Sequence, residues 1–170
     1  ESLGLPRSRA AAALICTLPG AVLLHDGQFT GRRVKLPVQI GRQPYEPPNT
    51  DLKAFYQTLL RETRAPVYQS GEWCALPVTR AKENHSHDNL IAYGWRDHTD
   101  HRLIVINLSD KQSQGHVNLS AWPEIAGCDW HLTDALNGDR YLRQGDLIEN
   151  VGLYVDLWPY GVHIFHFEPA

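Results

Sequence analysis

The stretch LIAYGWRDHTDHRLIVINLS, residues 90–109, contains two of the runs that decide the fold. Residues 90–95 and 103–108 are short and rich in β-branched and aromatic side chains, a texture that predicts β-strands. Runs of the same texture, separated by Gly, Asn, Asp and Ser turns, occupy residues 72–78, 116–119, 129–133, 153–157 and 162–167. No helical pattern interrupts them. From residue 66 onward the sequence therefore predicts an antiparallel β-sandwich or a barrel-like sheet.

The chain before residue 65 follows a different pattern. Ser8 can cap a helix over residues 9–17, and the all-apolar run 21–24 predicts a strand buried on both faces, as in a parallel sheet. Gly and Pro crowd residues 29–48 and predict a loop. A second helix is predicted over residues 51–63, because one apolar stripe recurs there at helical spacing. The stripe consists of Leu52, Phe55, Tyr56, Leu59 and Leu60.

Composition and charge exclude several classes of protein. The chain has 170 residues and 42% hydrophobic side chains, which is typical of a globular protein. Because 16 Lys and Arg face 19 Asp and Glu, no overall positive field is available to hold nucleic acid. The longest apolar stretch, residues 10–24, is too interrupted to span a membrane, so no membrane anchor is expected.

Cysteines and short motifs give no cofactor or metal centre. Cys16, Cys74 and Cys128 are far apart and odd in number, which fits neither a disulfide framework nor a zinc site. No P-loop and no Gly-x-Ser-x-Gly elbow occurs, so no cofactor is expected. The sparse cysteines and the lack of a visible signal peptide favour the cytoplasm.

Four phrases of the sequence, taken in order, resemble the end of the α-amylase family of glycoside hydrolases. LPGAVLLHDGQ (residues 18–28) resembles the last barrel strand of that family, and DLKAFYQTLL (51–60) is similar to its last barrel helix. LIAY with LIVINLS (90–93 and 103–109) is similar to the hairpin that opens the C-terminal β domain. WPYGVHIF (158–165) is similar to its closing strand. Each phrase is weak alone, but the ordered set covers nearly the whole chain.

The resemblance implies a fold and a parent activity. Residues 1–64 would be a helix-strand-loop-helix remnant of a (β/α)₈ barrel, and residues 65–170 would be the antiparallel β-sandwich called domain C. The family cleaves or transfers α-glucosidic linkages with retention, using two carboxyl groups about 5 Å apart on the barrel. These lie on the fourth and fifth barrel strands, so no catalytic residue is expected here. The expected role is structural support of the missing barrel portion, without activity of its own.

The alternative function is a free-standing module that binds starch or maltooligosaccharides, because exposed aromatic rings stack on sugars. Trp122 lies in a loop-like stretch and is the tryptophan we expect to be most exposed; Trp130 is a second candidate. Core packing is the commoner fate of a tryptophan in a sandwich. An α-glucan is therefore a possible ligand of the segment itself.

A second group of candidate substrate-binding residues follows the predicted strand 21–24. His25, Asp26, Gln28 and Arg32 would lie where the last barrel strand opens onto the active-site face. Asp26-Gly27 could equally form only a turn.

Histidines and acids gather in the phrase ENHSHD, residues 83–88. It is similar to a phrase of the seventh barrel strand in that family, but it follows the last predicted barrel helix, so we expect a surface loop. His85 and His87, with His98 and His101, could supply metal ligands if the loops met. Nothing in the spacing shows that they converge, and no metal site is expected.

A single barrel strand has no neighbouring strands to pair with its backbone N–H and C=O groups. Without neighbours, residues 21–24 leave backbone groups unpaired and apolar side chains in water. We expect the helix 51–63 to stay docked on the β domain. Residues 1–48 would repack, lean on a second copy of the chain, or require the missing barrel.

Overall fold

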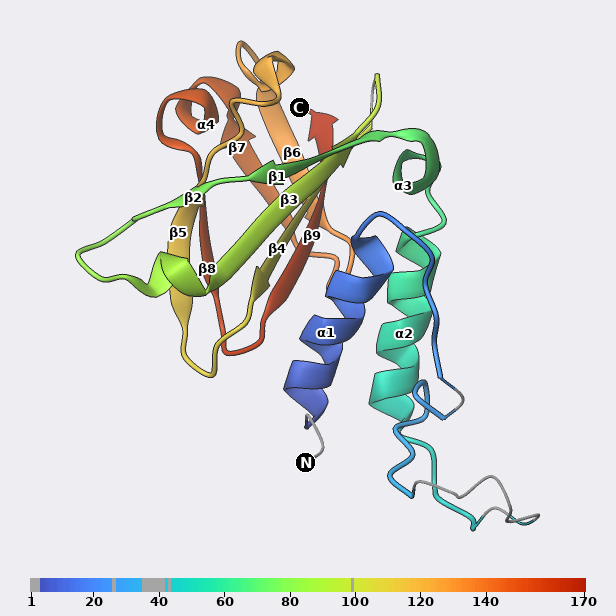
Figure 1. The fold of residues 1–170 in the computed structure, drawn as a ribbon. Helices are drawn as coiled ribbons and strands as arrows, with labels where there is room; N and C mark the ends of the chain where they lie inside the picture. Colours follow the sequence, from blue (N-terminus) through green and yellow to red (C-terminus); the bar gives the residue numbers. More distant parts are fainter. Residues whose placement is uncertain (1–3, 26, 35–41, 43, 99) are drawn as a thin grey trace.

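The computed structural model describes residues 4–25, 27–34, 42, 44–98 and 100–170. Figure 1 shows two layers of β-sheet, with two helices against the face of the larger sheet that points away from the smaller one. The mostly β, antiparallel fold predicted from the sequence is confirmed. None of the helices in the described residues is long and apolar enough to cross a membrane.

The larger sheet has six strands, all paired antiparallel, in the order β1-β3-β4-β9-β6-β7. Their bounds are β1 Glu72–Leu76, β3 Leu90–Arg96, β4 His101–Asn107, β6 Asp129–Asp134, β7 Arg140–Gln144 and β9 Val162–Pro169. β3 and β4 pair from Leu90 opposite Asn107 to Arg96 opposite His101. Residues 90–107 therefore form a hairpin within the larger sheet.

The smaller sheet has the order β2-β5-β8 and faces the larger one. It consists of β2 Val78–Thr79, β5 Ser113–Val117 and β8 Leu153–Leu157. Two 3₁₀ turns, η1 (Ser86–Asn89) and η2 (Pro123–Ile125), lie in the connections. The phrase of residues 83–88 leads into η1 between β2 and β3, which confirms that it is a surface loop between two strands of the β domain.

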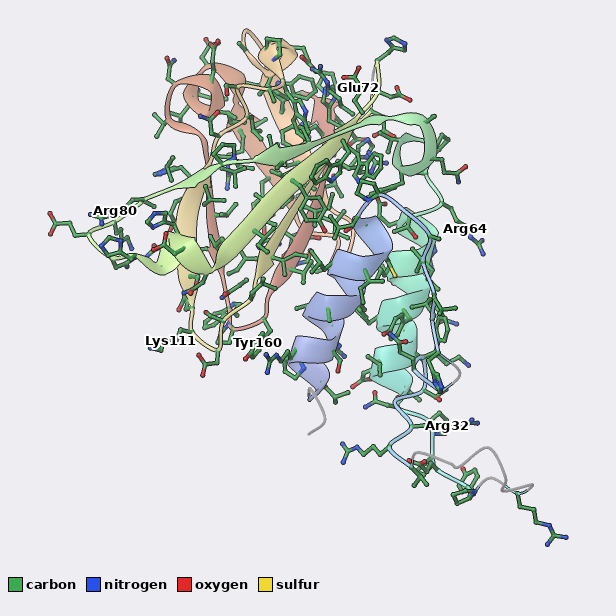
Figure 2. The ribbon with its side chains drawn as sticks, in the orientation of Figure 1. Arg32, Arg64, Glu72, Arg80, Lys111 and Tyr160 are labelled. Atoms are coloured by element: carbon green, nitrogen blue, oxygen red, sulfur yellow. The ribbon has the colours of Figure 1, made fainter. Side chains whose placement is uncertain are left out.

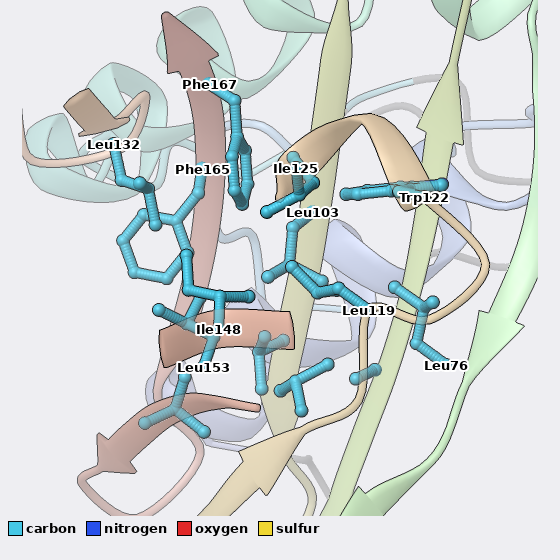
Figure 3. Close-up of a cluster of buried hydrophobic side chains, with 14 of the residues drawn as sticks. Leu76, Leu103, Leu119, Trp122, Ile125, Leu132, Ile148, Leu153, Phe165 and Phe167 are labelled. Carbon is cyan, nitrogen blue, oxygen red and sulfur yellow. The ribbon is translucent and has the colours of Figure 1, made fainter. Parts of the chain in front are cut away.

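The main core fills the space between the two sheets (Figure 3). Trp122 is its largest fully buried side chain, with 1% of its surface exposed, and it packs edge-on against Phe167 at 5.9 Å between ring centroids. Phe165 and Leu132 of the larger sheet face Leu153 of the smaller one (Figure 3). This alternation of buried side chains explains the period of two that the sequence shows.

A second core joins the helices to the larger sheet. α1 (Leu5–Thr17) and α2 (Thr50–Glu62) lie side by side, and a short helix α3 (Val67–Ser70) follows α2 (Figure 1). Ala10 and Ala13 are buried in α1, and small side chains there let the helix approach β4 closely. The Trp95 indole donates to the Thr17 carbonyl at 2.7 Å.

The expected docking of the second helix is confirmed. Tyr56 and Leu59 of α2 are buried in the same cluster as Ile104 of β4. Asn49 caps the helix, because its side chain accepts from the Leu52 N–H at 2.9 Å. The expected cap at Ser8 is wrong: α1 begins at Leu5, one residue before Pro6, so Ser8 lies inside the helix.

Two other expectations are wrong. Residues 21–24 run alongside α2 and form no strand (Figure 1). Leu23 is 90% exposed, so the strand that the sequence predicts to be buried on both faces is not formed. The region after residue 66 also contains two helices, the short α3 and α4 (Gly145–Val151), where no helix was expected. Gly145 starts α4 in close contact with backbone, since a Cβ there would lie 2.0 Å from the Ile125 carbonyl oxygen.

Candidate functional site

The surface formed by residues 4–25, 27–34 and α2 is the main candidate functional site, and we call it the amino-terminal face. A groove of about 320 Å³ lies between α1, α2 and the turn of residues 27–33. Leu5 and Ile15 of α1 line it and are 39% and 48% exposed. A second groove of about 220 Å³ lies nearer α3 and includes Val22. Apolar side chains thus remain in water along this whole side of the protein.

The extended segment beyond α1 has the same character. Val22 is 43% exposed and Leu23 is 90% exposed; Val34, beyond the turn of residues 27–33, is 49% exposed. Val22 and Leu23 are adjacent exposed apolar residues, and they add to the apolar surface on this side of the protein. The amino-terminal face therefore exposes several apolar side chains to solvent.

The candidate residues near this face have different environments. Gln28 is half-buried, and its amide donates to the Tyr56 hydroxyl at 2.7 Å while its carbonyl accepts from the His25 N–H at 3.2 Å. Gln28 therefore ties the turn to α2. Arg32 is exposed and lines the groove beyond the start of α2 (Figure 2). Asp26 lies outside the described residues.

A turn does occupy this place. Gly27 has φ +83°, and its carbonyl accepts from the N–H groups of Thr30 and Arg32. A Cβ at Gly27 would also lie 2.8 Å from Arg32 Cδ, so glycine suits both the conformation and the space. The turn interpretation of Asp26-Gly27 is supported at its second residue.

The expectation that Trp122 is exposed is wrong, and Trp130 is buried as well. They are 1% and 6% exposed, and the Trp130 indole donates to the Ile125 carbonyl at 2.8 Å. Both rings belong to the core between the two sheets. A ring buried in this way has no face available for a sugar. The most exposed tryptophan is Trp158, at 74%, in the turn between β8 and β9.

The connection between the helices and the β domain is a buried ionic cluster. Arg102 of β4 donates through Nε to Glu62 of α2 at 2.6 Å and through a terminal nitrogen to Asp100. The Tyr68 hydroxyl donates to the same Glu62 carboxylate at 3.2 Å. Burial, with the Glu62 charge beside it, raises the pKa of Tyr68, so the phenol stays protonated and can donate. This cluster fixes α2 relative to the sheet.

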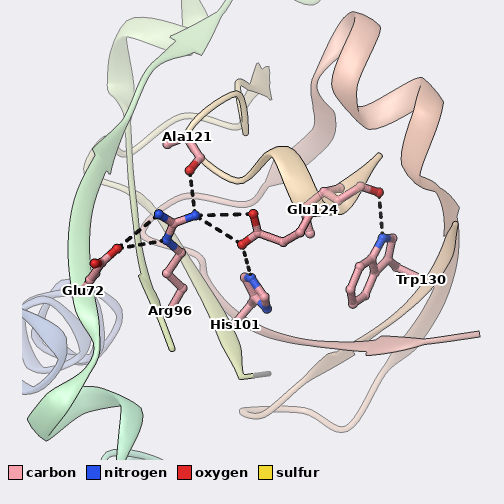
Figure 4. Close-up of polar contacts among 7 residues, drawn as sticks. Glu72, Arg96, His101, Ala121, Glu124 and Trp130 are labelled. Atoms are coloured by element: carbon pink, nitrogen blue, oxygen red, sulfur yellow. Dashed lines mark hydrogen bonds and ion pairs between the residues drawn. The ribbon is translucent and has the colours of Figure 1, made fainter. Parts of the chain in front are cut away.

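A second charged cluster lies at the edge of the larger sheet near η2 (Figure 4). Arg96 lies between Glu72 at 3.1 Å and Glu124 at 3.2 Å, and it donates to the Ala121 carbonyl at 3.0 Å. The His101 ring, only 3% exposed, contacts Glu124 through Nε2 at 2.7 Å. These contacts hold η2, and with it Trp122, against the sheet. The charged groups are paired with one another, whereas the buried Nδ1 of His101 has no hydrogen-bond partner among the described residues.

Glu124 gives this cluster a pH dependence. Burial alone would raise the pKa of Glu124, but the His101 hydrogen bond, a backbone N–H and the Arg96 charge outweigh it, so the pKa is lowered from 4.5. A carboxyl with a lowered pKa in the folded state stabilises it above the ordinary pKa, and this contribution is lost as the pH falls through the lowered value.

We therefore expect Glu124→Gln to lower the melting temperature at neutral pH. The variant should also show a smaller further fall in melting temperature as the pH drops from about 5 through the lowered pKa of Glu124. The melting temperature measured across that range for both proteins checks this. If the melting temperatures of the variant and the original chain fell equally with pH, Glu124 would not be a source of the pH dependence.

The histidines expected as possible metal ligands do not form a site. His85 and His87 stack at 6.1 Å in the exposed loop, and Arg80 contacts His85 at 2.7 Å. His101 is instead buried beside Glu124. The part of the chain that the structure describes contains no group of three or more side chains arranged to hold a metal ion.

Comparison with solved structures shows that the fold is similar to part of several α-amylases. A maltogenic α-amylase, AmyB, from Thermotoga neapolitana has a TM-score of 0.75 and 16% identity over 96% of this chain and 37% of its own. An Anoxybacillus α-amylase has a TM-score of 0.71 and 14% identity over 97% of this chain and 33% of its own. The α-amylase of Geobacillus thermoleovorans has a TM-score of 0.69 and 13% identity over 97% and 34%.

No family model and no curated protein sequence matches the chain. The structural likeness confirms the resemblance to α-amylases at the level of the fold. The chain spans about a third of the length of the α-amylase structures that it matches.

Proposed function

We propose that this chain is the C-terminal portion of an α-amylase-type glycosidase or transglycosidase that acts on α-glucans. The observation that carries the proposal is the likeness of nearly the whole chain, helices included, to about a third of several α-amylases. We assign residues 1–64 to the end of the (β/α)₈ barrel and residues 65–170 to the β domain that follows it.

The amino-terminal face supports this assignment. Residues 21–24 are extended, apolar and without a sheet partner, and they follow a helix and precede another, as a strand of a (β/α)₈ barrel does. A neighbouring parallel strand would pair their backbone groups and cover Leu23. The role of the segment is then to complete the barrel and to brace it through the buried Glu62–Arg102 pair.

The proposed substrate class follows from the similar proteins. Related α-amylase structures hold acarbose or maltose. Retaining cleavage of such substrates needs two carboxyl groups about 5 Å apart on the barrel face, and the resemblance puts these on earlier barrel strands. We therefore propose that the 170-residue segment has no turnover by itself.

Leu23→Glu tests the proposed role of the amino-terminal face. Because Leu23 is 90% exposed, the charge should change the free energy of unfolding of the isolated chain by less than about 0.5 kcal/mol. Burying a leucine in an interface contributes about 1.5–3 kcal/mol, so the variant should bind a separately expressed barrel portion of the same polypeptide at least about tenfold more weakly. Analytical ultracentrifugation of the mixture measures this.

Leu147→Glu is the matched control. Leu147 is 55% exposed on α4, which lies on the opposite side of the sandwich from α1 (Figure 1), so this charge should not affect assembly. Equal assembly of the Leu23→Glu variant and the original chain would overturn the proposed face. Hydrolysis of starch by the 170-residue chain alone would overturn the proposed division of labour.

The isolated chain should also self-associate through the same face. Light scattering at increasing protein concentration is expected to show oligomers that Leu23→Glu reduces and Leu147→Glu does not. A clean monomer at all concentrations would contradict an uncovered apolar face.

A further inference from the structure

A histidine of β9 lies beside the buried ionic cluster that joins the helices to the larger sheet. His166 is directly opposite Arg102 where β4 and β9 pair, so the two side chains project from the same face of the sheet. The next pair along that face, Ile104 and Ile164, is buried in the core under the helices. His166 therefore belongs to the helix side of the larger sheet.

The other face of β9 carries a different histidine. The Nδ1 of His163 contacts the completely buried Asp134 at 2.6 Å, and the ring stacks on Phe165 at 4.9 Å. Phe165 belongs to the core between the two sheets. The alternation along β9 thus separates His163 from the ionic cluster and places His166 next to it.

His166 and Arg102 share one carboxylate oxygen. Asp100 Oδ1 accepts a hydrogen bond from Arg102, and the same oxygen lies 3.5 Å from His166 Nε2. The Arg102 side chain is 9% exposed and that of His166 is 34% exposed. A neutral His166 leaves Asp100 to Arg102. A protonated His166 would place a second cation beside Arg102 and compete with it for this oxygen.

The neighbours of His166 within the sheet offer it no undivided counterion. Glu168 lies two residues further along β9, and its carboxylate is paired with Arg140 of β7 at 3.6 Å. On β6, the residue opposite His166 is the uncharged Thr133, and His131 lies opposite Glu168. The nearest acid on this strand is therefore already in contact with an arginine.

The groups on the helix side belong to α2 and α3. Arg102 Nε donates to Glu62 at 2.6 Å, and the Tyr68 hydroxyl donates to the same carboxylate at 3.2 Å. Burial, and next the Arg102 charge, lower the pKa of His166 from 6.5. The acids around the ring offset these two effects only in part; they are Asp100, Glu168 and Glu62. The folded chain therefore disfavours a proton on His166.

We propose that His166 makes the contact between α2 and the larger sheet sensitive to pH, so that protonation of this side chain favours release of the helices. When α2 leaves the sheet, water reaches His166 and Arg102, and two adjacent cations become less costly. The open state then takes up the proton more readily than the closed state, so acid increases its population.

The direction of the effect follows from proton linkage. The stabilisation of the closed state is fully present above the ordinary pKa of histidine, and it is lost as the pH falls from about 6.5 through the lowered pKa of His166. The inference rests on the contacts of the fold and does not depend on the proposed activity on α-glucans.

Hydrogen exchange of the 170-residue chain at about pH 7.5 and about pH 5.5, expressed as protection relative to unfolded peptides, tests this inference. Between the two pH values, protection in α2 should fall about two- to fivefold more in the original chain than in His166→Gln. Protection in β4 should change equally in both proteins. All other titratable groups are common to them, so the difference isolates His166. His166→Asn, which carries a shorter amide, should behave as His166→Gln does.

His116→Gln is the matched control. His116 is a half-buried histidine on β5 of the smaller sheet, 5.6 Å from the Tyr154 ring, and the larger sheet separates it from the helices (Figure 1). This variant should keep the pH dependence of the original chain. An equal fall of α2 protection in the original chain and in both His166 variants would overturn the inference. So would a His166-dependent fall of the same size in α2 and β4, because the proton would then act on the whole fold.

Discussion

Replacing Arg102 by methionine is expected to lower the free energy of unfolding by about 3–5 kcal/mol. The Arg102 side chain is 9% exposed and neutralises Glu62, which is 15% exposed, so its removal leaves a buried carboxylate without its cation. For a chain of this length the change corresponds to a fall in melting temperature of about 6–20 °C. Urea unfolding followed by circular dichroism measures it.

The position of Arg102 also predicts where the loss appears first. The pair joins α2 to β4, so its rupture should loosen the helices before the sandwich opens. Hydrogen exchange in α2 should accelerate more than exchange in β4. Uniform acceleration in both elements would contradict a specific coupling role.

Two further variants separate the buried pair from charge in general. Arg140→Met removes an exposed cation that lies 3.6 Å from Glu168, and such surface pairs contribute less than about 1 kcal/mol. The double variant Arg102→Met/Glu62→Leu should recover much of the loss, because a buried pair replaced by apolar side chains is often neutral. No recovery would mean that Asp100 and Tyr68 also depend on Arg102.

Local patterns made part of this fold predictable. The helix of α2 follows from the spacing of Leu52, Tyr56 and Leu59 and from the Asn49 cap, and each of these signals lies within four residues. The strands likewise follow from alternation along the chain. The ordered resemblance to α-amylases also rests on short stretches of sequence.

The candidate sites depend on contacts that sequence patterns do not contain. Asp134 and His163 are 29 positions apart and meet only because β6 pairs with β9. In the sequence, Arg102 is a polar residue at the end of a predicted strand, which does not indicate burial. Its burial depends on the ion pair with Glu62, which is 40 positions away. The segment 21–24 has the composition of a buried strand, but burial requires neighbours that the described residues lack. In each case the deciding partner is remote in the sequence.

Truncating Trp122 to alanine should have an effect as large as that of breaking the ionic pair. Its indole fills the end of the core between the sheets and contacts Phe167 and His101, so removal should cost about 3–5 kcal/mol. Trp158→Ala removes the same side chain from a position that is 74% exposed and should change stability by less than about 0.5 kcal/mol. Chemical unfolding of both variants makes the comparison.

Gly94 provides a second mutation that identifies the cause of the Trp122 effect. A Cβ at Gly94 would lie 2.1 Å from Trp122 Cζ2, so Gly94→Ala alone should destabilise the chain by about 1–3 kcal/mol or more through overpacking. In the Trp122→Ala background the ring is gone and the added methyl group enters the vacated space. The cost of Gly94→Ala should then fall, and the double-mutant cycle should show a favourable interaction between the two substitutions. If the effects of the two substitutions on the free energy of unfolding were strictly additive, the Trp122 indole would not contact Gly94, and other side chains would fill that end of the core.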